Sequence, residues 1–214
     1  MKKILITGIT GQDGLLLTEK YLNENENHFV YGISRSNDLN LFYKKLHSLH
    51  VKSVENLKIL NIDLNNRNQV FDLLKKINPQ AVYNFSGPSS VYQSLDNKEG
   101  SISTIKNIFD NLTESLIKLE NFCNFFQASS SEMFENVSNN AIDENTRMVP
   151  NSPYASGKHE NHKTVLKLSK EFNWNIVSGI MFNHESEFRE DDYLIKKIIN
   201  SADKISKKQM SSFQ

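Results

Sequence analysis

The sequence predicts an α/β protein built on a doubly wound parallel sheet. Short apolar runs, typical of buried parallel strands, alternate along the chain with longer segments of helical periodicity. The first apolar run, residues 4–6, leads into a turn with three glycines and then into a helical segment. No internal repeat and no low-complexity linker interrupts this alternation. Strands joined by helices in this way form a parallel sheet with right-handed crossovers and helices on both faces.

The strands are predicted from short apolar runs bounded by polar or turn residues. We expect them, in chain order, at residues 4–6, 29–33, 57–61, 81–85, 124–127 and 175–182. Ligands of such sheets bind outside the carboxyl ends of the strands, so the functional residues should be sought where these runs end.

The helices are predicted from apolar residues that recur every three to four positions. We expect them at about residues 13–23, 39–50, 66–77 and 99–119. The third helix has the clearest ends, because Asn66 is a good N-cap and Pro79 stops the helix.

Composition excludes several classes of protein. The 25 Lys and Arg residues balance 25 Asp and Glu residues, which argues against a general nucleic-acid binder. Because the chain passes from Met1 straight into the first strand, we expect no signal peptide, and no apolar run approaches the ~20 residues that span a bilayer. Cys123 is the single cysteine, and His159 and His162 lack a third ligand, so we expect no disulfide and no metal. We expect a cytoplasmic protein with no nucleic-acid or membrane partner.

A nucleotide site is predicted at the first turn. Gly8, Gly11 and Gly14 lie between the first strand and the first helix in the spacing Gly-x-x-Gly-x-x-Gly. Glycines there let the backbone come close to a pyrophosphate at the positive end of the following helix. The strand before the turn and the helix after it distinguish such a site from an ordinary glycine-rich loop.

The end of the second strand bears on the choice of cofactor. In a dinucleotide fold this position contacts the adenosine ribose, and an acidic residue there favours NAD. Ser34, Arg35 and Ser36 stand there instead and suit the 2′-phosphate of NADP. We expect NADP; the alternatives are NAD and an Arg35 that is only a solvated loop residue. After the fourth strand, Ser86 opens a run of small residues that suits close passage of a cofactor or any tight turn.

Two segments carry the candidate catalytic groups. Residues 128–132, at the end of the fifth strand, include three serines and Glu132. Tyr154 and Lys158 are four residues apart and share a face if their segment is helical. A lysine cation beside a phenol stabilises the phenolate and lowers the pKa of the phenol, which makes a usable acid or base.

With these motifs, the sequence resembles the extended short-chain dehydrogenase/reductases and, within them, the GDP-mannose 4,6-dehydratases. The resemblance rests on residues 8–14, 127–132, 152–155 and 182–186 and covers nearly the whole chain. It implies a Rossmann-like fold, an NADP cofactor and an internal redox cycle on GDP-mannose or a related sugar nucleotide. In that cycle C4 is oxidised, water is eliminated across C5 and C6, and hydride returns to C6. We also expect a homo-oligomer, either a dimer or a tetramer.

The resemblance implies roles for individual residues. Ser130 would contact the substrate oxygen, where the family has Thr, and Tyr154 would take the proton of the C4 hydroxyl. Lys158 would hold the nicotinamide ribose and tune Tyr154, and Glu132 would remove the C5 proton. The residues expected to bind the cofactor are Gly8, Thr10, Gly11, Gln12, Asp13, Gly14, Arg35, Asp63, Leu64, Ser86, Tyr154, Lys158, Asn183 and His184. The alternative for Glu132 is a solvated loop acid, and for His184 a hydrogen-bonded structural histidine.

Some positions depart from the family. Residues 186–190 replace its Ser-Pro-Arg-Arg-Gly and put two acids near an expected sugar diphosphate, an unfavourable exchange of charge. We expect residues 1–185 to form the NAD(P)-binding domain and residues 186–214 to begin a truncated substrate-binding domain, with impaired activity. The alternatives are a catalytically degenerate NADP-binding protein and a related sugar-nucleotide epimerase or reductase; Glu132 speaks against a reductase.

Overall fold

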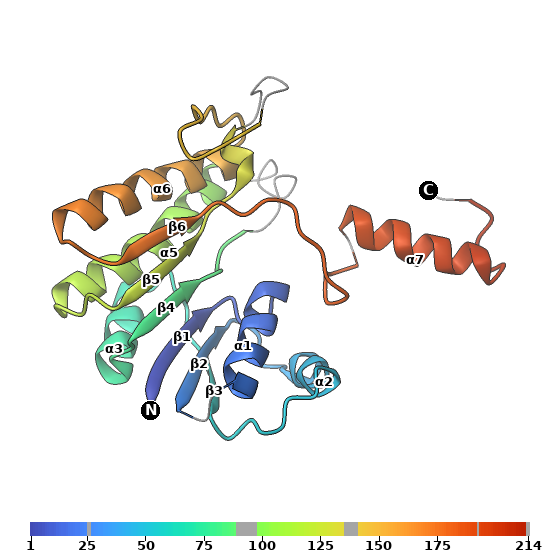
Figure 1. Ribbon diagram of the computed structural model, residues 1–214, viewed down its shortest axis with the longest axis horizontal. Coiled ribbons are helices and arrows are strands. Elements are labelled where there is room, and N and C mark those ends of the chain that lie inside the picture. The colour runs from blue at the N-terminus through green and yellow to red at the C-terminus, as the bar shows by residue number, and fades with distance from the viewer. Residues whose placement is uncertain (25–26, 89–97, 135–140, 192, 213–214) are drawn as a thin grey trace. The chain divides into compact units, whose positions relative to one another are not determined.

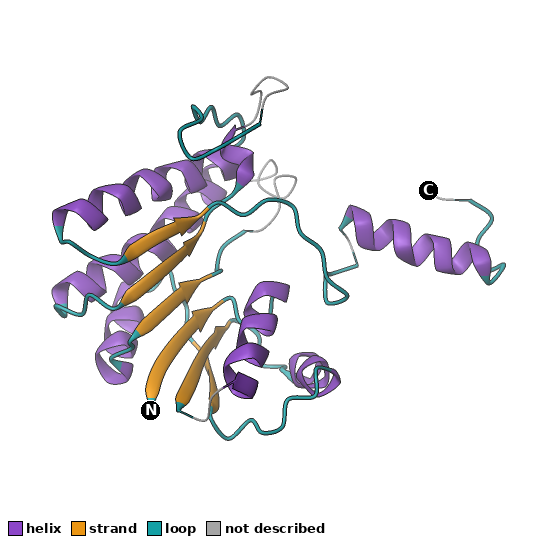
Figure 2. Ribbon diagram, viewed as in Figure 1, coloured by secondary structure: helices purple, strands orange, loops and turns teal. Residues whose placement is uncertain are grey.

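The computed structural model describes residues 1–24, 27–88, 98–134, 141–191 and 193–212 (Figure 1). The strands are β1 (Lys2–Thr7), β2 (His28–Ser34), β3 (Leu57–Asn61), β4 (Ala81–Asn84), β5 (Asn124–Ala128) and β6 (Ile176–Gly179). The helices are α1 (Gln12–Glu24), α2 (Asn40–Ser48), α3 (Arg67–Ile77), α5 (Lys98–Lys118), the 3₁₀ helix η1 (Ser131–Phe134), α6 (Pro153–Glu171) and α7 (Leu194–Ser206). Strands and helices alternate, as the sequence predicts (Figure 2).

The strands form one parallel sheet in the order β3-β2-β1-β4-β5-β6. The chain winds from β1 through β2 to β3 and then crosses back to β4, so the winding direction reverses between β1 and β4. The helix α1 covers one face of the sheet, with α2 packed against α1, and α3, α5 and α6 cover the other face (Figures 1 and 2). This arrangement is the doubly wound, Rossmann-like fold and confirms the predicted fold class.

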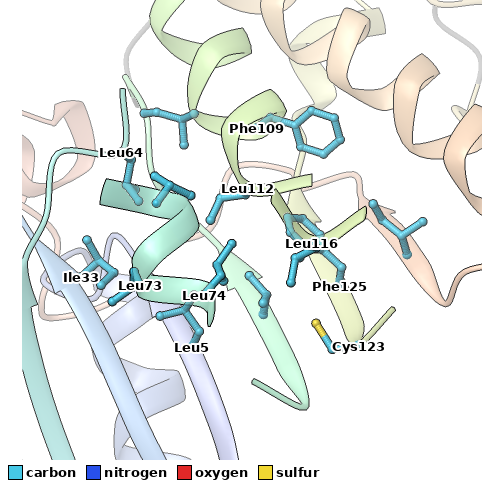
Figure 3. Close-up of a cluster of buried hydrophobic side chains, with 14 of the residues drawn as sticks. Leu5, Ile33, Leu64, Leu73, Leu74, Phe109, Leu112, Leu116, Cys123 and Phe125 are labelled. Carbon is cyan, nitrogen blue, oxygen red and sulfur yellow. The ribbon is translucent and has the colours of Figure 1, made fainter. Parts of the chain in front are cut away.

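A large hydrophobic cluster joins the sheet to the helices α3, α5 and α6 (Figure 3). Leu5, Val82 and Phe125 project from neighbouring strands and meet Leu74 of α3 and Phe109 of α5. The rings of Phe109 and Phe125 are T-shaped, with centroids 6.0 Å apart. Since burial of one such side chain stabilises by about 1.5–3 kcal/mol, this cluster fixes the helices of this face against the strands.

The helix α3 begins and ends as predicted. The side chain of Asn66 accepts hydrogen bonds from the backbone N–H groups of Asn68 and Gln69 at 3.1 and 3.2 Å. Asn78 then adopts the left-handed region, with φ of +49°, and ends the helix ahead of Pro79.

The helix α6 also begins at a local signal. Its N-cap is Ser152, whose hydroxyl accepts a hydrogen bond from the Ala155 N–H at 3.1 Å, and Pro153 occupies the first helical position. Tyr154 and Lys158 therefore lie in the first two turns of a capped helix, so the predicted helical spacing of the pair is confirmed.

The strand β6 is shorter than the predicted run of residues 175–182. It spans Ile176–Gly179, because its partner β5 ends at Ala128, which pairs with Gly179. Beyond that point the Ser131 N–H still reaches the Met181 carbonyl at 2.9 Å, but β6 does not continue.

The chain divides into two compact units, Met1–Phe182 and Asn183–Gln214. The first unit holds the whole sheet and the helices α1 to α6. The second holds α7, which has no buried residue among those described. The predicted domain boundary at residues 185 and 186 stays a prediction. Among the described helices, none combines the length and the apolar character that crossing a bilayer requires.

Candidate active site

The glycine-rich turn after β1 is tightly packed at two of its three glycines. Gly8 has a φ of +69°, and a Cβ atom there would lie 2.9 Å from the Phe85 carbonyl. A Cβ atom on Gly14 would lie 2.5 Å from the Gly8 carbonyl oxygen, so the fold itself requires both glycines. At Gly11 the nearest atom would be 3.4 Å away, and the residue is exposed directly before α1. The predicted pyrophosphate site at this helix N-terminus stays a prediction.

The helix α6 brings Tyr154 and Lys158 together. The Nζ atom of Lys158 lies 5.6 Å from the centroid of the Tyr154 ring. It also donates a hydrogen bond to the Ala128 carbonyl oxygen at 2.8 Å, which anchors the lysine at the carboxyl end of β5. Lys158 is 5% exposed, and burial lowers the pKa of its ammonium to about 8. In the part of the chain that the structure describes, no carboxylate pairs with this ammonium, so its charge can act on a nearby phenolate.

The serines after β5 differ in their surroundings. The hydroxyl of Ser129 donates to the Met133 sulfur at 3.2 Å and is buried. The Ser130 oxygen accepts a hydrogen bond from the Glu132 backbone N–H at 3.2 Å, a bond that does not use the hydroxyl proton. Glu132 is half-buried on η1, which packs against α6. Ser130 and Glu132 therefore belong to the same edge of the sheet as the lysine of α6, as predicted from the sequence.

Other predicted cofactor residues lie at the carboxyl ends of further strands. Arg35 is exposed after β2, and Ser86 follows β4, where its N–H donates to the Asn84 side-chain oxygen at 3.2 Å. The Asp63 carboxylate, after β3, is exposed and accepts the backbone N–H two residues further on at 2.9 Å. The side chain of Leu64 is 6% exposed in the hydrophobic core, so only its backbone could face a ligand.

The remaining predicted residues divide between the two units. Thr10 is exposed in the glycine-rich turn, and Gln12 opens α1 and is buried. Asn183 and His184 are exposed residues of the second unit, so their predicted place beside the nicotinamide stays a prediction.

An apolar pocket of about 370 Å³ lies between α1 and the middle of the sheet. Its lining comes from α1, β4, β5 and the segments that follow the strands, and consists of Asp13, Leu16, Leu17, Lys20, Tyr83, Phe85, Phe126 and Met181. None of the four predicted catalytic residues lines it. Asp13 is the one predicted cofactor residue among those that line this pocket.

Sequence reasoning missed or misread some polar residues. Asn84 and Gln127 are each 1% exposed, and hydrogen bonds run through them to the Ala128 carbonyl that anchors the lysine of α6. A signal was present, because each is a polar residue at the end of a strand whose alternate positions are apolar. From the sequence, His162 is considered only as a metal ligand, but its Nδ1 atom lies 2.9 Å from the Ser178 hydroxyl and it is half-buried against β6.

A tyrosine and a lysine of one helix, at the carboxyl edge of a doubly wound sheet with a glycine-rich first turn, place the chain in the short-chain dehydrogenase/reductase class. Within that class, residues 5–214 match the family described as GDP-mannose 4,6 dehydratase. The chain belongs to this family.

Individual proteins show the same relationship. A GDP-mannose 4,6 dehydratase of Drosophila melanogaster is 30% identical over 223 residues, which cover 100% of this chain and 55% of the relative. The structure of dTDP-glucose 4,6-dehydratase from Bacillus anthracis in complex with NAD has a TM-score of 0.78 at 20% identity, and covers 95% of this chain and 62% of that chain. The structure of RMD from Pseudomonas aeruginosa complexed with NADPH has a TM-score of 0.78 at 17% identity, and covers 98% and 64%. The chain thus spans little more than half the length of its curated relative.

Proposed function

We propose that this chain binds NADP at the carboxyl edge of its sheet and carries the catalytic groups of a 4,6-dehydratase for GDP-mannose or a related sugar nucleotide. The observation that carries the proposal is the placement of Lys158, which is buried beside Tyr154 and held 2.8 Å from the Ala128 carbonyl. Membership of the family supports the choice of substrate. Solved structures of similar fold contain NAD or NADPH, which supports a nicotinamide dinucleotide.

The residues present suit such a cofactor. When bound, the nicotinamide ring supplies the capacity to accept a hydride from C4 and return it to C6. The open position at Gly11 offers the N-terminus of α1 to a pyrophosphate. The exposed Arg35 offers a cation to a 2′-phosphate, which favours NADP over NAD.

The phenolate of Tyr154 takes the proton of the C4 hydroxyl, and becomes a phenol, as that carbon is oxidised. The cation of Lys158 favours the phenolate, because an opposite charge stabilises the ionised form. With a pKa of about 8, the lysine is still mostly protonated near neutral pH and can supply this charge. The hydroxyl of Ser130, oriented by the Glu132 N–H, donates a hydrogen bond to the same substrate oxygen.

The carboxylate of Glu132 removes the proton from C5. A ketone at C4 acidifies that hydrogen, and elimination of the C6 hydroxyl as water then requires a base at C5. A simple reductase has no proton to remove from carbon, so an acidic residue on η1 favours a dehydratase.

A second candidate is an NADP-binding protein without catalysis. In the second unit, Arg189 pairs with Glu185 at 3.2 Å and lies 4.1 Å from the centroid of the Tyr193 ring. An arginine engaged in this way is less available to a sugar diphosphate, and Glu187 and Glu190 add negative charge nearby. These contacts favour weak substrate binding with cofactor binding retained.

One experiment separates these candidates. Purified protein is incubated with NADP and GDP-mannose, the product is followed by mass spectrometry, and NADP binding is measured by calorimetry. A 4-keto-6-deoxy product supports the dehydratase, an epimer of unchanged mass supports an epimerase, and binding without product supports the binding protein. Absence of both binding and product refutes the proposal. We expect weak turnover, because Glu187 and Glu190 place negative charge near the expected sugar diphosphate.

Two variants separate the catalytic steps in protein that shows hydride transfer. Glu132→Gln should retain oxidation at C4 and lose exchange of the C5 hydrogen with solvent deuterium, because only the base is removed. Tyr154→Phe should lose both reactions. Glu144→Gln, an exposed acid, is the matched control and should change neither. Undiminished C5 exchange in Glu132→Gln would show that another group is the base.

The assembly and location belong to the same proposal. We propose a cytoplasmic homo-oligomer, either a dimer or a tetramer. Light scattering coupled to size-exclusion chromatography measures the mass directly, and a mass equal to one chain of 24.6 kDa would contradict the oligomer.

A further inference from the structure

A row of polar side chains crosses the sheet just beyond its hydrophobic core. Thr7 pairs in register with Asn84, Asn84 with Gln127, and Gln127 with Ser178. Two residues earlier on the same four strands stand apolar residues, namely Leu5, Val82, Phe125 and Ile176. Alternate residues of a strand share a face, so the polar row lies on the same face as the apolar row, one step nearer the carboxyl edge.

Three residues of this row form a continuous chain of hydrogen bonds. The Thr7 hydroxyl donates to Asn84 Oδ1 at 2.6 Å, and Asn84 Nδ2 donates to Gln127 Oε1 at 2.7 Å. Gln127 Nε2 then donates to the Ala128 carbonyl oxygen at 3.0 Å, which also accepts the bond from Lys158 at 2.8 Å. Each side chain of this hydrogen-bond network is at most 5% exposed, so its polar atoms have little access to water.

The groups at the two ends of this hydrogen-bond network determine the orientation of both amides. At one end the Ser86 backbone N–H, which can only donate, lies 3.2 Å from Asn84 Oδ1. At the other end the Ala128 carbonyl, which can only accept, faces Gln127 Nε2. Turning either amide over would set two donors or two acceptors against each other. The network therefore has one direction, and it ends at the carbonyl that anchors the lysine.

The Ala128 carbonyl is held by the backbone and by side chains. The Ser129 N–H of the same peptide unit donates to the Gly179 carbonyl at 2.8 Å, and the side chains of Gln127 and Lys158 donate to the Ala128 oxygen itself. The ladder between β4 and β5 ends at the pair Asn84 and Gln127, one residue before Ala128. Buried amides cost free energy unless they are hydrogen-bonded, and apolar residues would continue the core without that requirement. An amide pair at this place thus provides what an apolar pair cannot: a hydrogen bond to the Ala128 oxygen beside the one from Lys158 of α6.

We infer that Asn84 and Gln127, supported by Thr7, are positioning residues that orient the Ala128 carbonyl and thereby hold the Lys158 ammonium beside Tyr154. The inference deepens the proposed function, because the role of the lysine rests on it. Neither amide reaches a reacting atom; both act through the carbonyl. In a protein with this arrangement, a change two links away from the lysine alters the state of the lysine.

The charges near α6 do not explain the state of the lysine. Titratable groups on the described parts of the elements packed against α6 are Glu132 of η1 and Lys106, Asp110, Glu114 and Lys118 of α5. Burial alone accounts for the lowered pKa of Lys158 among the described residues. Its one described hydrogen bond to an oxygen, from the ammonium to Ala128, opposes that lowering because it favours the charged form.

The test follows the Lys158 ammonium directly in the free protein. The pKa is measured by NMR of ¹³C-labelled lysine, with the signal assigned by its absence in Lys158→Arg. Gln127→Met and Asn84→Leu should each lower the pKa of the lysine by about one pH unit, the equivalent of weakening a charge-assisted hydrogen bond. Thr113→Val is the control, because it removes a buried hydroxyl bound within α5 and should leave the pKa unchanged.

The outcomes decide the inference in either direction. An unchanged pKa in folded Gln127→Met and Asn84→Leu refutes it. A raised pKa also refutes it, because it would mean that the amide only competes with the lysine for the carbonyl. If these variants do not fold, Thr7→Val decides: it removes only the first donor, and a smaller lowering is expected, whereas no change refutes the inference.

A cofactor measurement separates this inference from the proposed function. If the inference and the proposed function both hold, Gln127→Met and Asn84→Leu weaken NADP binding several-fold in calorimetry, and Thr113→Val does not. If the parent protein binds no NADP while the pKa of Lys158 still depends on both amides, the proposed function fails and the inference stands. If the parent binds NADP and the pKa is independent of both amides, the inference fails alone.

Discussion

Replacing Lys158 with methionine should stabilise the folded protein near neutral pH. The side chain is 5% exposed, and burial holds the pKa of its ammonium at about 8, below the ordinary value of 10.5. Because one pH unit corresponds to about 1.4 kcal/mol, keeping this lysine charged in the folded state costs about 3 kcal/mol. Methionine is similar in length and uncharged, and the Ala128 carbonyl keeps its bond from Gln127. Lys158→Met should therefore raise the free energy of unfolding by up to about 3 kcal/mol.

The stabilisation should depend on pH in a definite direction. Between the folded pKa of about 8 and the ordinary value of 10.5, the unfolded chain binds the proton more strongly than the folded protein. The parent protein therefore gains stability as the pH rises through this window. Lys158→Met lacks that gain, so its advantage is largest below the folded pKa and disappears above the ordinary value.

Denaturant unfolding of parent and variant near neutral pH and near the top of this window measures the effect. Lys170→Met, at an exposed position on the same helix, is the matched control and should not reproduce the pH-dependent difference. If Lys158→Met were less stable than the parent at neutral pH, the bond to Ala128 would outweigh the cost of burial. If the difference in the free energy of unfolding between Lys158→Met and the parent did not change with pH, the ammonium of Lys158 would not be desolvated. Either result would refute the reasoning.

Three further changes test other parts of the structure. Gly11→Val should weaken NADP binding about tenfold or more in calorimetry. The fold should persist because a Cβ atom has room at this position, but the valine side chain would occupy the space that a pyrophosphate needs. Undiminished NADP binding contradicts the predicted site. Arg35→Ala should weaken NADP more than NAD, and equal losses would remove the argument for a 2′-phosphate. Asn66→Ala should lower the free energy of unfolding by about 1 kcal/mol in denaturant titrations, and unchanged stability would show that this cap contributes nothing.

The sequence was sufficient for the fold because its signals are local. The strands buried on both faces are apolar runs, and Asn66 marks the start of α3 with its own side chain. The end of β6 was not predictable in the same way. Apolar residues continue to Phe182, but the strand stops at Gly179 because β5, the partner 51 positions away in register, has ended. Strand ends depend on neighbours that a local pattern does not contain.

The candidate site was predictable only in part. The spacing of Tyr154 and Lys158 gave their shared face, but the acceptor of the lysine is a backbone carbonyl, which no residue pattern reveals. Asn84 and Gln127 bond across 43 positions of sequence, and each looks alone like an ordinary polar residue. The glycines of the first turn are alike in the sequence, yet only the structure separates Gly8 and Gly14 from Gly11.

The central place of β1 has a consequence for the newly made chain. β1 precedes the other described strands in the chain, and it can pair with β2 once residue 34 has emerged. The other edge of β1 pairs with β4, which is complete only after Asn84 has been synthesised. At ordinary rates of synthesis this delay is about 3–10 seconds. During it, one edge of a strand whose Ile4, Leu5 and Ile6 are buried in the folded protein has no partner and is open to pairing with other chains. Production of this protein should therefore depend more on chaperones than that of a hairpin-rich sheet of equal length, whose strands pair as each is made.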